Sequence, residues 1–579
     1  MSAITETIPT EVEAVPMSQA STRHTDMRSR GEPALWALGG ALALGIVMIV
    51  GFLALVFWNG VATFVPKPLP VVTDASGNVT AGEPFREELF RLQPDELAKL
   101  SPEWQARIEK DGGFASRTLY RLGNFDFYGD DFRWVPDFTL VKTEYPKNML
   151  FVERLEWGPF VGTIKNFKLD GVEQPFSTLD DPKFLAAHDA ARDRWREIRD
   201  IERDRIGAIN HDIEEARLGL RKIELKTGKD SADYKAAQAE GQARQVDLTR
   251  AYDQLAAQAQ KLRERNATNT VTVVEIGGRD KTVELSQLVR FYAANDLSFA
   301  QKVGVYFSRW VEFLTTEPRE ANTEGGVLPA IFGTAAMTLL MVVVVAPFGV
   351  ITALYLREYA KQGRLVSFVR ISVNNLAGVP SIVYGVFGLG FFAYVLGGSL
   401  DALFYPERLP NPTFGTGGLM WAALTLALLT VPVVIVATEE ALAAVPRSMR
   451  EGSLACGASK WQTIKYIILP RAMPGIMTGI ILSMARGAGE VAPLMLIGVV
   501  KLAPQLPVDG FFPFVHLERS FMHLGFHIFD VGFQSRNAEA GKPMVFVTTM
   551  LLMALIFIMN ISAIIIRNRL KRKFQGSQF

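Results

Sequence analysis

The stretch Glu451–Met495 reads EGSLACGASKWQTIKYIILPRAMPGIMTGIILSMARGAGEVAPLM, and it decides the fold of this chain. Its first half is a polar, interrupted helical segment between two apolar stretches, which predicts a cytoplasmic loop between two membrane spans. Gly452 and Ser453 are small enough for close packing in this loop. Gly457 permits backbone angles that other residues resist, and Pro470 lacks the N–H that a continuing helix would use. The sequence therefore predicts a bent, closely packed loop.

The loop has the pattern E-small-small-x3-G-x9-I-x-L-P, which resembles the EAA loop of ABC importer permeases. In that family two short helices bend at the glycine and dock into a cleft of a separate ATPase subunit. The second and third alanines of the family pattern are replaced here by other small residues. We bound the loop at residues 439–471. The resemblance implies that the residues coupling to the ATPase are Glu451, Gly452, Ser453, Gly457, Ile467, Leu469 and Pro470.

The second half of the stretch carries two charges in an apolar run. From Ala472 to Val500, only Arg486 and Glu490 are charged, and Arg486 falls near the middle of the expected span. Because a charge at the bilayer centre costs roughly 2.5–3.5 kcal/mol on insertion scales, such residues usually face a cavity or a partner. The two residues share one helix face and can neutralise one another. The guanidinium also suits bidentate recognition of a phosphate or a carboxylate. We expect a substrate pathway at Arg486 and Glu490, with a purely packing ion pair as the alternative.

The segment ARGAGEVAPLM resembles the ARAxGExAPL signature of PstA-type permeases of phosphate-specific ABC importers. The segment Gly378–Gly390, GVPSIVYGVFGLG, is similar to the third helix of that family. The resemblance covers roughly Ala34–Val65 and Gly325–Lys573. It implies an all-α membrane bundle of the type I importer class. It also implies a PstC-like permease partner, a PstB-like ATPase dimer that handles ATP and Mg, and a periplasmic phosphate-binding protein.

The composition and the motifs of the chain argue against several classes of function. The chain is 49% hydrophobic and 21% charged, and the two characters are segregated along it. The net charge is only +1, so the chain lacks the excess of basic residues that is typical of nucleic-acid-binding proteins. No G-x-x-x-x-G-K-[ST] occurs, so ATP must be handled by a partner. The lone Cys456 excludes a disulfide within one chain, and we expect it to be a small buried residue. His523 and His527 lack an acidic motif, so we expect ordinary surface or interface residues, no metal site, no cofactor and no enzyme activity.

The chain divides into five segments with alternating character. These are a disordered cytoplasmic tail (1–32), a first transmembrane helix (33–66), an inserted domain (67–324), a permease core with five transmembrane helices (325–566) and a basic cytoplasmic tail (567–579). Besides the run with Arg486, the spans expected in the core are Leu328–Leu356, Ile371–Leu396, Leu419–Ala437 and Met544–Ile566. Lys and Arg gather in alternate connections between the spans. By the positive-inside rule, both termini and the EAA loop lie in the cytoplasm of an inner-membrane protein, and the inserted domain lies outside.

The inserted domain has two sequence characters. To about Phe176 it carries short aromatic and β-branched runs between Gly and Pro, which predicts strands with a few helices. Residues 182–265 are rich in Ala, Glu, Arg and Gln and are broken once at Lys226–Ser231. Apolar residues step by three and four along both arms, so we predict a long antiparallel helical hairpin with a coiled-coil seam. Thr270–Ile276 and Lys281–Leu285 predict a β-hairpin. We therefore expect an α+β domain inserted into the helical bundle.

The favoured function is the transmembrane subunit of an ATP-driven importer of inorganic phosphate. A permease for another oxyanion, such as sulfate or molybdate, stays open, since an arginine fork by itself does not separate these anions. A membrane-anchored envelope sensor or scaffold, working through the helical hairpin, is the alternative from a different class.

Overall fold

The structure is a computed structural model that describes residues 32–503, 505–535 and 538–575. The chain forms two compact units, Met1–Trp58 and Asn59–Phe579. Residues 1–31 of the expected disordered tail and residues 576–579 of the expected basic tail lie outside the described residues. The unit that begins at Met1 contains most of helix α1 (Glu32–Ala62). This helix is uncharged after its first residue and exposes large apolar side chains all round, as suits a helix surrounded by lipid.

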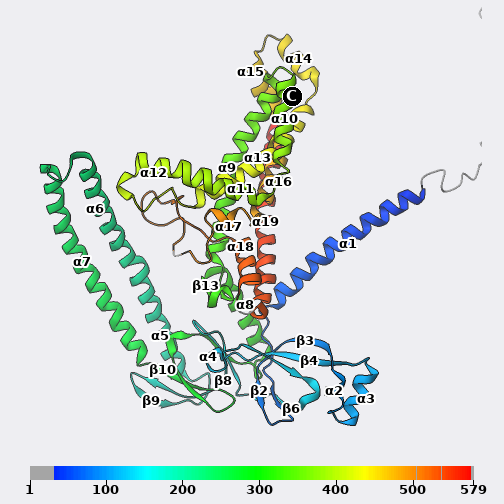
Figure 1. Cartoon of the computed structure of the whole chain (residues 1–579), viewed down its shortest axis with the longest axis vertical. Helices are drawn as coiled ribbons and strands as arrows, with labels where there is room; N and C mark the ends of the chain where they lie inside the picture. Colours follow the sequence, from blue (N-terminus) through cyan, green and yellow to red (C-terminus); the bar gives the residue numbers. More distant parts are fainter. Residues whose placement is uncertain (1–31, 504, 536–537, 576–579) are drawn as a thin grey trace, which may run out of the picture. The chain divides into compact units, whose positions relative to one another are not determined.

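The described residues contain six helices long and apolar enough to span a membrane (Figure 1). The chain is therefore a helical membrane protein with about six apolar helices. Their bounds are Pro33–Ala62, Leu328–Tyr359, Ser381–Phe404, Leu419–Ala443, Lys460–Gly489 and Glu539–Arg569.

The bounds predicted for the third span are wrong. It runs from Ser381 to Phe404, whereas the sequence predicted Ile371–Leu396. The preceding residues form a separate amphipathic helix, α10 (Arg364–Leu376). Pro380 disfavours the helical conformation of the residue before it and donates no backbone hydrogen bond, so the chain breaks there and restarts as α11 (Ser381–Phe387).

Helix α13 (Leu419–Ala443) lies at the centre of the bundle between α9 (Leu328–Leu354) and α16 (Leu469–Gly489). Small residues set the spacing on the α16 side. A Cβ built on Gly479 would lie 2.4 Å from the Cβ of Ala437, and one on Gly475 would lie 2.6 Å from the Cβ of Ala441. Close approach of this kind drives helix packing in a membrane, where lipid is as apolar as the side chains. The bundle is completed by α19 (Ala538–Gln575).

The region between α1 and α9 is built from antiparallel strands and helices. A six-stranded sheet has the order β11-β10-β8-β7-β12, with β9 paired to β8, and two three-stranded sheets have the orders β3-β4-β5 and β2-β1-β6. The strand bounds are β1 Val71–Asp74, β2 Val79–Ala81, β3 Glu83–Arg91, β4 Phe114–Arg121, β5 Phe132–Pro136, β6 Leu140–Glu144, β7 Leu150–Arg154, β8 Phe160–Leu169, β9 Val172–Pro175, β10 Thr270–Val274, β11 Asp280–Glu284 and β12 Leu288–Ala293. The alternating buried side chains of β8 and β10 pack against α5 (Pro182–Arg199). Three further short helices are α2 Pro94–Leu97, α3 Pro102–Lys110 and α4 Phe125–Tyr128.

Two long helices, α6 (Ile206–Thr227) and α7 (Ala232–Ala267), pack along each other and form the two arms in Figure 1. Gly228, with φ of 79°, ends the first arm. The hydroxyl of Ser231 accepts a hydrogen bond from Tyr234 N and caps the second arm. Side chains of α6 also contact loops of the bundle: the ring centroids of His211 and Phe511 are 4.6 Å apart, and α6 lies against the turn Pro406–Arg408. The arms are thus held beside the bundle at more than one point.

Candidate functional site

The fifth membrane helix is broken where the two expected pathway residues lie. The sequence predicted one span from Ala472 to Val500, but α16 ends at Gly489 and Glu490 is extended, with φ of −76° and ψ of 135°. A four-residue helix, α17 (Leu494–Ile497), follows, and Gly498 then turns the chain with φ of 137°. Glycines before the break and Pro493 after it remove the local support for a continuous helix. The span therefore ends at Gly489, earlier than the Val500 expected from the apolar run.

Arg486 lies in the last turn of α16 rather than in the middle of a span. The break nevertheless lies deep in the bundle. A Cβ on Gly487 would lie 2.4 Å from the sulfur of Met341, which is about halfway along α9, and a Cβ on Gly385 of α11 would lie 2.7 Å from Cα of Pro493. Non-helical backbone at membrane depth is tolerated where protein covers it or where it lines a cavity. The break thus has the character of a site built between helices.

The charges at the break are only loosely paired. Nε of Arg486 lies 3.6 Å from Oε1 of Glu490, too far for a good hydrogen bond but close enough for Coulomb attraction. The side chains are 38% and 21% exposed, respectively. Within the described residues the Arg486 guanidinium makes no hydrogen bond. An arginine that served only to lock the packing of this chain would bury its donors against acceptors. The geometry leaves the donors of Arg486 open to a ligand or to another subunit.

The loop expected to dock the ATPase is two helices that bend at Gly457. Helix α14 (Arg447–Ala455) precedes the bend, and α15 (Lys460–Thr463) begins the continuous helix that enters the membrane. Gly457 has φ of +84°, the left-handed region in which glycine is favoured. Across the bend, the hydroxyl oxygens of Ser453 and Thr463 are 2.9 Å apart and share a hydrogen bond. A capping box of Ser459 and Gln462 fixes the start of α15.

Five of the seven residues assigned to coupling line one surface hollow. They are Gly452, Ser453, Ile467, Leu469 and Pro470. Glu451 and Gly457 do not line the hollow and are exposed. Three large apolar side chains on the same loop are also exposed, namely Leu454, Trp461 and Tyr466. Sequence reasoning missed these three, although large apolar residues in a polar loop were a usable signal. Together with the hollow, they give the loop a surface suited to a protein partner.

Arg450, which the sequence analysis did not single out, ties α14 to the end of α13. It donates to the carbonyls of Leu442 at 2.6 Å and Val445 at 3.0 Å, and it forms an ion pair with Glu358 at 3.1 Å. Leu442 is in the last turn of α13 and Val445 follows its C-cap residue, Ala444, so the cation lies where it is also favoured by the helix dipole. Arg450 therefore connects α14 to the end of the central helix of the bundle.

Two minor predictions are wrong. Cys456 is exposed rather than buried, because it caps α14 on the outer side of the bend. His523 and His527 are not surface residues: they are 0% and 2% exposed, because α18 (Leu524–Phe529) packs against α9 and α19. Nδ1 of His523 accepts a hydrogen bond from Gly525 N. In the described part of the chain, no group of three or more His, Cys, Asp or Glu side chains could hold a metal ion.

Comparison with known proteins relates the helical part of the chain to transporters. Residues 345–572 match the family model described as the inner membrane component of binding-protein-dependent transport systems. Over 234 residues the chain is 30% identical to the probable ABC transporter permease protein YqgI of Bacillus subtilis, covering 40% of this chain and 74% of that protein. It is 35% identical over 205 residues to the probable ABC transporter permease protein YqgH of the same organism, covering 34% of this chain and 62% of that protein.

A third relative carries a substrate in its name. Over 173 residues the chain is 40% identical to the phosphate transport system permease protein PstA 1 of Mycobacterium tuberculosis, covering 30% of this chain and 51% of that protein. Across the three relatives, the chain spans between about half and three quarters of their length. All the matched lengths are far shorter than the chain, and the residues that the family model matches, 345–572, lie in its helical part.

Proposed function

Because the chain belongs to the family of inner membrane permeases of binding-protein-dependent ABC transport systems, we propose that it forms half of the pathway of an ATP-driven importer of inorganic phosphate. Its relatives are named as permeases, which are transport proteins and not enzymes in themselves. The observation that carries the proposal is Arg486 in the last turn before the break in α16, deep in the bundle and with open donors. The name of the PstA relative supports phosphate as the anion.

The arginine suits a tetrahedral oxyanion. Its planar guanidinium offers paired N–H groups that match two oxygens of a phosphate. Glu490, 3.6 Å away, neutralises Arg486 when no anion is present, and phosphate competes with it for the guanidinium. Broken helices at membrane depth are typical substrate sites of transporters, because the interrupted backbone exposes polar groups that a continuous helix would satisfy. Arg486 and Glu490 are thus the substrate pathway residues of the proposal.

Coupling to ATP goes through the loop Glu451–Pro470. A separate ATPase dimer, which holds the ATP and Mg, docks on the hollow that Gly452, Ile467 and their neighbours line. Its closure pulls on α14, and Arg450 passes this motion to α13. A second, PstC-like permease completes the pathway, and a phosphate-binding protein delivers the anion from outside.

The anion is tested by transport competition. The chain, a sister permease, an ATPase dimer and a binding protein are reconstituted in vesicles, and uptake of labelled phosphate is measured with ATP supplied on the side of the ATPase. We expect ATP-dependent uptake that excess unlabelled phosphate abolishes and that excess sulfate or molybdate leaves unchanged. Equal inhibition by sulfate would favour the broader oxyanion permease. A fully assembled complex that moves none of these anions would favour the sensor or scaffold.

The orientation is tested with a reporter phosphatase that is active only outside the cytoplasm. It is inserted in the exposed turn Gly228–Ser231 between α6 and α7, and in a second strain it is fused after Phe579. The positive-inside rule predicts activity for the insertion and no activity for the C-terminal fusion. A green fluorescent reporter that folds only in the cytoplasm serves as the control and is expected to give the opposite pattern. Phosphatase activity after Phe579 would contradict the proposed six-span topology.

A further inference from the structure

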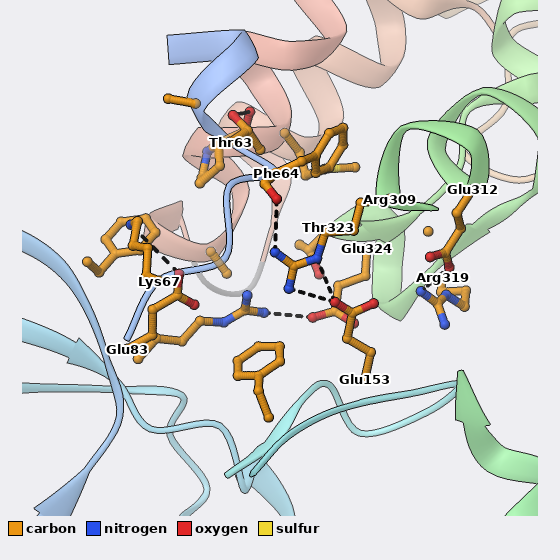
Figure 2. Close-up of a pocket in the computed structure, with 18 residues that line it drawn as sticks. Thr63, Phe64, Lys67, Glu83, Glu153, Arg309, Glu312, Arg319, Thr323 and Glu324 are labelled. Atoms are coloured by element: carbon orange, nitrogen blue, oxygen red, sulfur yellow. Dashed lines mark hydrogen bonds and ion pairs between the residues drawn. The ribbon is translucent and has the colours of Figure 1, made fainter. Parts of the chain in front are cut away.

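Helix α8 (Phe299–Thr315), which precedes the second membrane span, turns two of its three charged side chains, Arg309 and Glu312, inward, while Lys302 is exposed. Arg309 donates to Oε1 of Glu153 at 2.8 Å and to the hydroxyl of Tyr292 at 2.7 Å. Glu312 forms ion pairs with Arg319 at 2.5 Å and with Arg290 at 2.9 Å. Figure 2 shows Arg309 and Glu312 among the residues that line this charged pocket. Burial alone would raise the pKa of Glu153, but Arg309 and Arg290 beside it hold that pKa below its ordinary value.

The outward side of α8 is divided into two sectors. One sector carries five large apolar side chains at spacings of three and four residues: Phe299 (83% exposed), Val303 (37%), Phe307 (61%), Val311 (60%) and Leu314 (38%). At 100° per residue, these fall within one sector of about 120°. The adjoining exposed sector carries only small or polar residues, namely Gln301, Gly304, Ser308 and Thr315. A helix facing only water would bury its apolar stripe, whereas α8 exposes this stripe and turns Arg309 and Glu312 inward.

The position of α8 indicates what covers the apolar sector. Phe313 is fully buried among Val327 and Ala330 at the start of α9 and Met544 near the start of α19. The ring of Trp310 lies 5.0 Å from that of Phe64, just after the end of α1. These contacts are the points where membrane spans begin or end, so α8 lies at the level of a membrane boundary. Aromatic residues such as Trp310 are enriched at that level.

We propose that α8 is an interfacial helix that buries its apolar sector in the acyl chains of the adjoining leaflet. Its small and polar sector faces water. On its inner face, Arg309 forms an ion pair with Glu153 of strand β7 and so attaches α8 to the sheet. An interfacial helix buries its apolar face by roughly 5–10 Å at the boundary of headgroups and acyl chains. The exposed apolar sector carries no charged residue, so the binding requires no anionic lipid. Contact with the lipid would fix the orientation of the inserted region relative to the membrane surface.

The test places spin labels on the full chain in phosphatidylcholine nanodiscs. In a Cys456→Ser background, single cysteines replace Phe307 and Val311 in the apolar sector and Gln301 and Ser308 in the polar sector. All four side chains are exposed; Phe307 and Val311 leave no hydrogen bond behind, whereas Gln301→Cys removes the bond from Ser298 N and Ser308→Cys removes the bond from Arg290. We expect labels at 307 and 311 to collide severalfold more with lipid-soluble oxygen than with a water-soluble nickel complex. Labels at 301 and 308 are expected to show the reverse.

Two outcomes would overturn the proposal. If labels at 307 and 311 meet the nickel complex as readily as those at 301 and 308, the apolar sector faces water. If labels at 307 and 311 are immobile and shielded from both reagents, a protein surface covers the sector instead of lipid. Size-exclusion profiles that match the parent chain show that the labelled variants are folded.

Discussion

A chain with Gly457→Val is expected to reach the membrane normally and to lose ATP-driven uptake. Gly457 has φ of +84°, and nothing lies within 4 Å of the position that its Cβ would take. The cost of valine is therefore backbone strain and not a clash, since a β-branched residue in the left-handed region is an outlier. Strain of this kind costs on the order of 1–3 kcal/mol. Relieving it would open the bend and separate Ser453 from Thr463.

The expected magnitude follows from that strain. A penalty of about 1–3 kcal/mol on the docking conformation lowers the affinity for the ATPase by roughly 5–150-fold. Copurification of the ATPase with the tagged chain, and uptake at matched complex levels, measure the loss. Insertion of the six apolar helices should be unaffected, because none of them contains the bend.

Two substitutions serve as controls for the bend. Gly457→Asn should keep most of the coupling, because asparagine visits the left-handed region far more readily than valine. Gly452→Ala adds a methyl group in α14 where no atom of the chain lies within 4 Å, so it should leave folding unchanged. If Gly457→Val copurifies with the ATPase and transports at the parent rate, the loop does not depend on this glycine for docking.

The helical membrane class and the permease family could be predicted from the sequence because both depend on local features. A long apolar stretch without charged residues predicts a membrane-spanning helix, whatever that helix packs against. The bend at Gly457 could likewise be read from one residue, since a positive φ is a local requirement.

Features that depend on several segments at once could not be predicted. The break after Gly489 is stabilised by contacts of Gly487 with α9 and of Pro493 with α11, and neither contact is visible in a single hydrophobic run. The burial of His527 depends on the packing of α18 against α19 and against α9, which is distant in sequence. The third span was placed too early because apolar residues on both sides of Pro380 were read as one helix. In each case tertiary contacts decided what the local pattern left open.

Replacing Arg486 by lysine or by methionine is expected to abolish phosphate uptake, and methionine is also expected to weaken assembly because it leaves Glu490 without a countercharge. Lysine keeps the charge but loses the planar fork, and methionine keeps most of the volume but loses the charge. Removing one partner of a hydrogen-bonded charge pair, here the proposed pair of Arg486 with the bound phosphate, costs on the order of 2–5 kcal/mol. That loss corresponds to a fall in uptake of about thirtyfold or more. Few contacts within the chain are lost, since the side chain is 38% exposed and pairs only loosely with Glu490.

The double variant Arg486→Met with Glu490→Gln separates a pathway arginine from a packing one. Methionine alone leaves Glu490 without its countercharge, whereas glutamine at 490 removes that charge as well. If Arg486 meets the anion, the neutral pair restores assembly to the parent level but not transport, because it offers phosphate no cationic donor. A packing role predicts instead that assembly and uptake recover together. Uptake is measured in vesicles with matched amounts of complex, and normal uptake by the double variant would exclude Arg486 from the pathway.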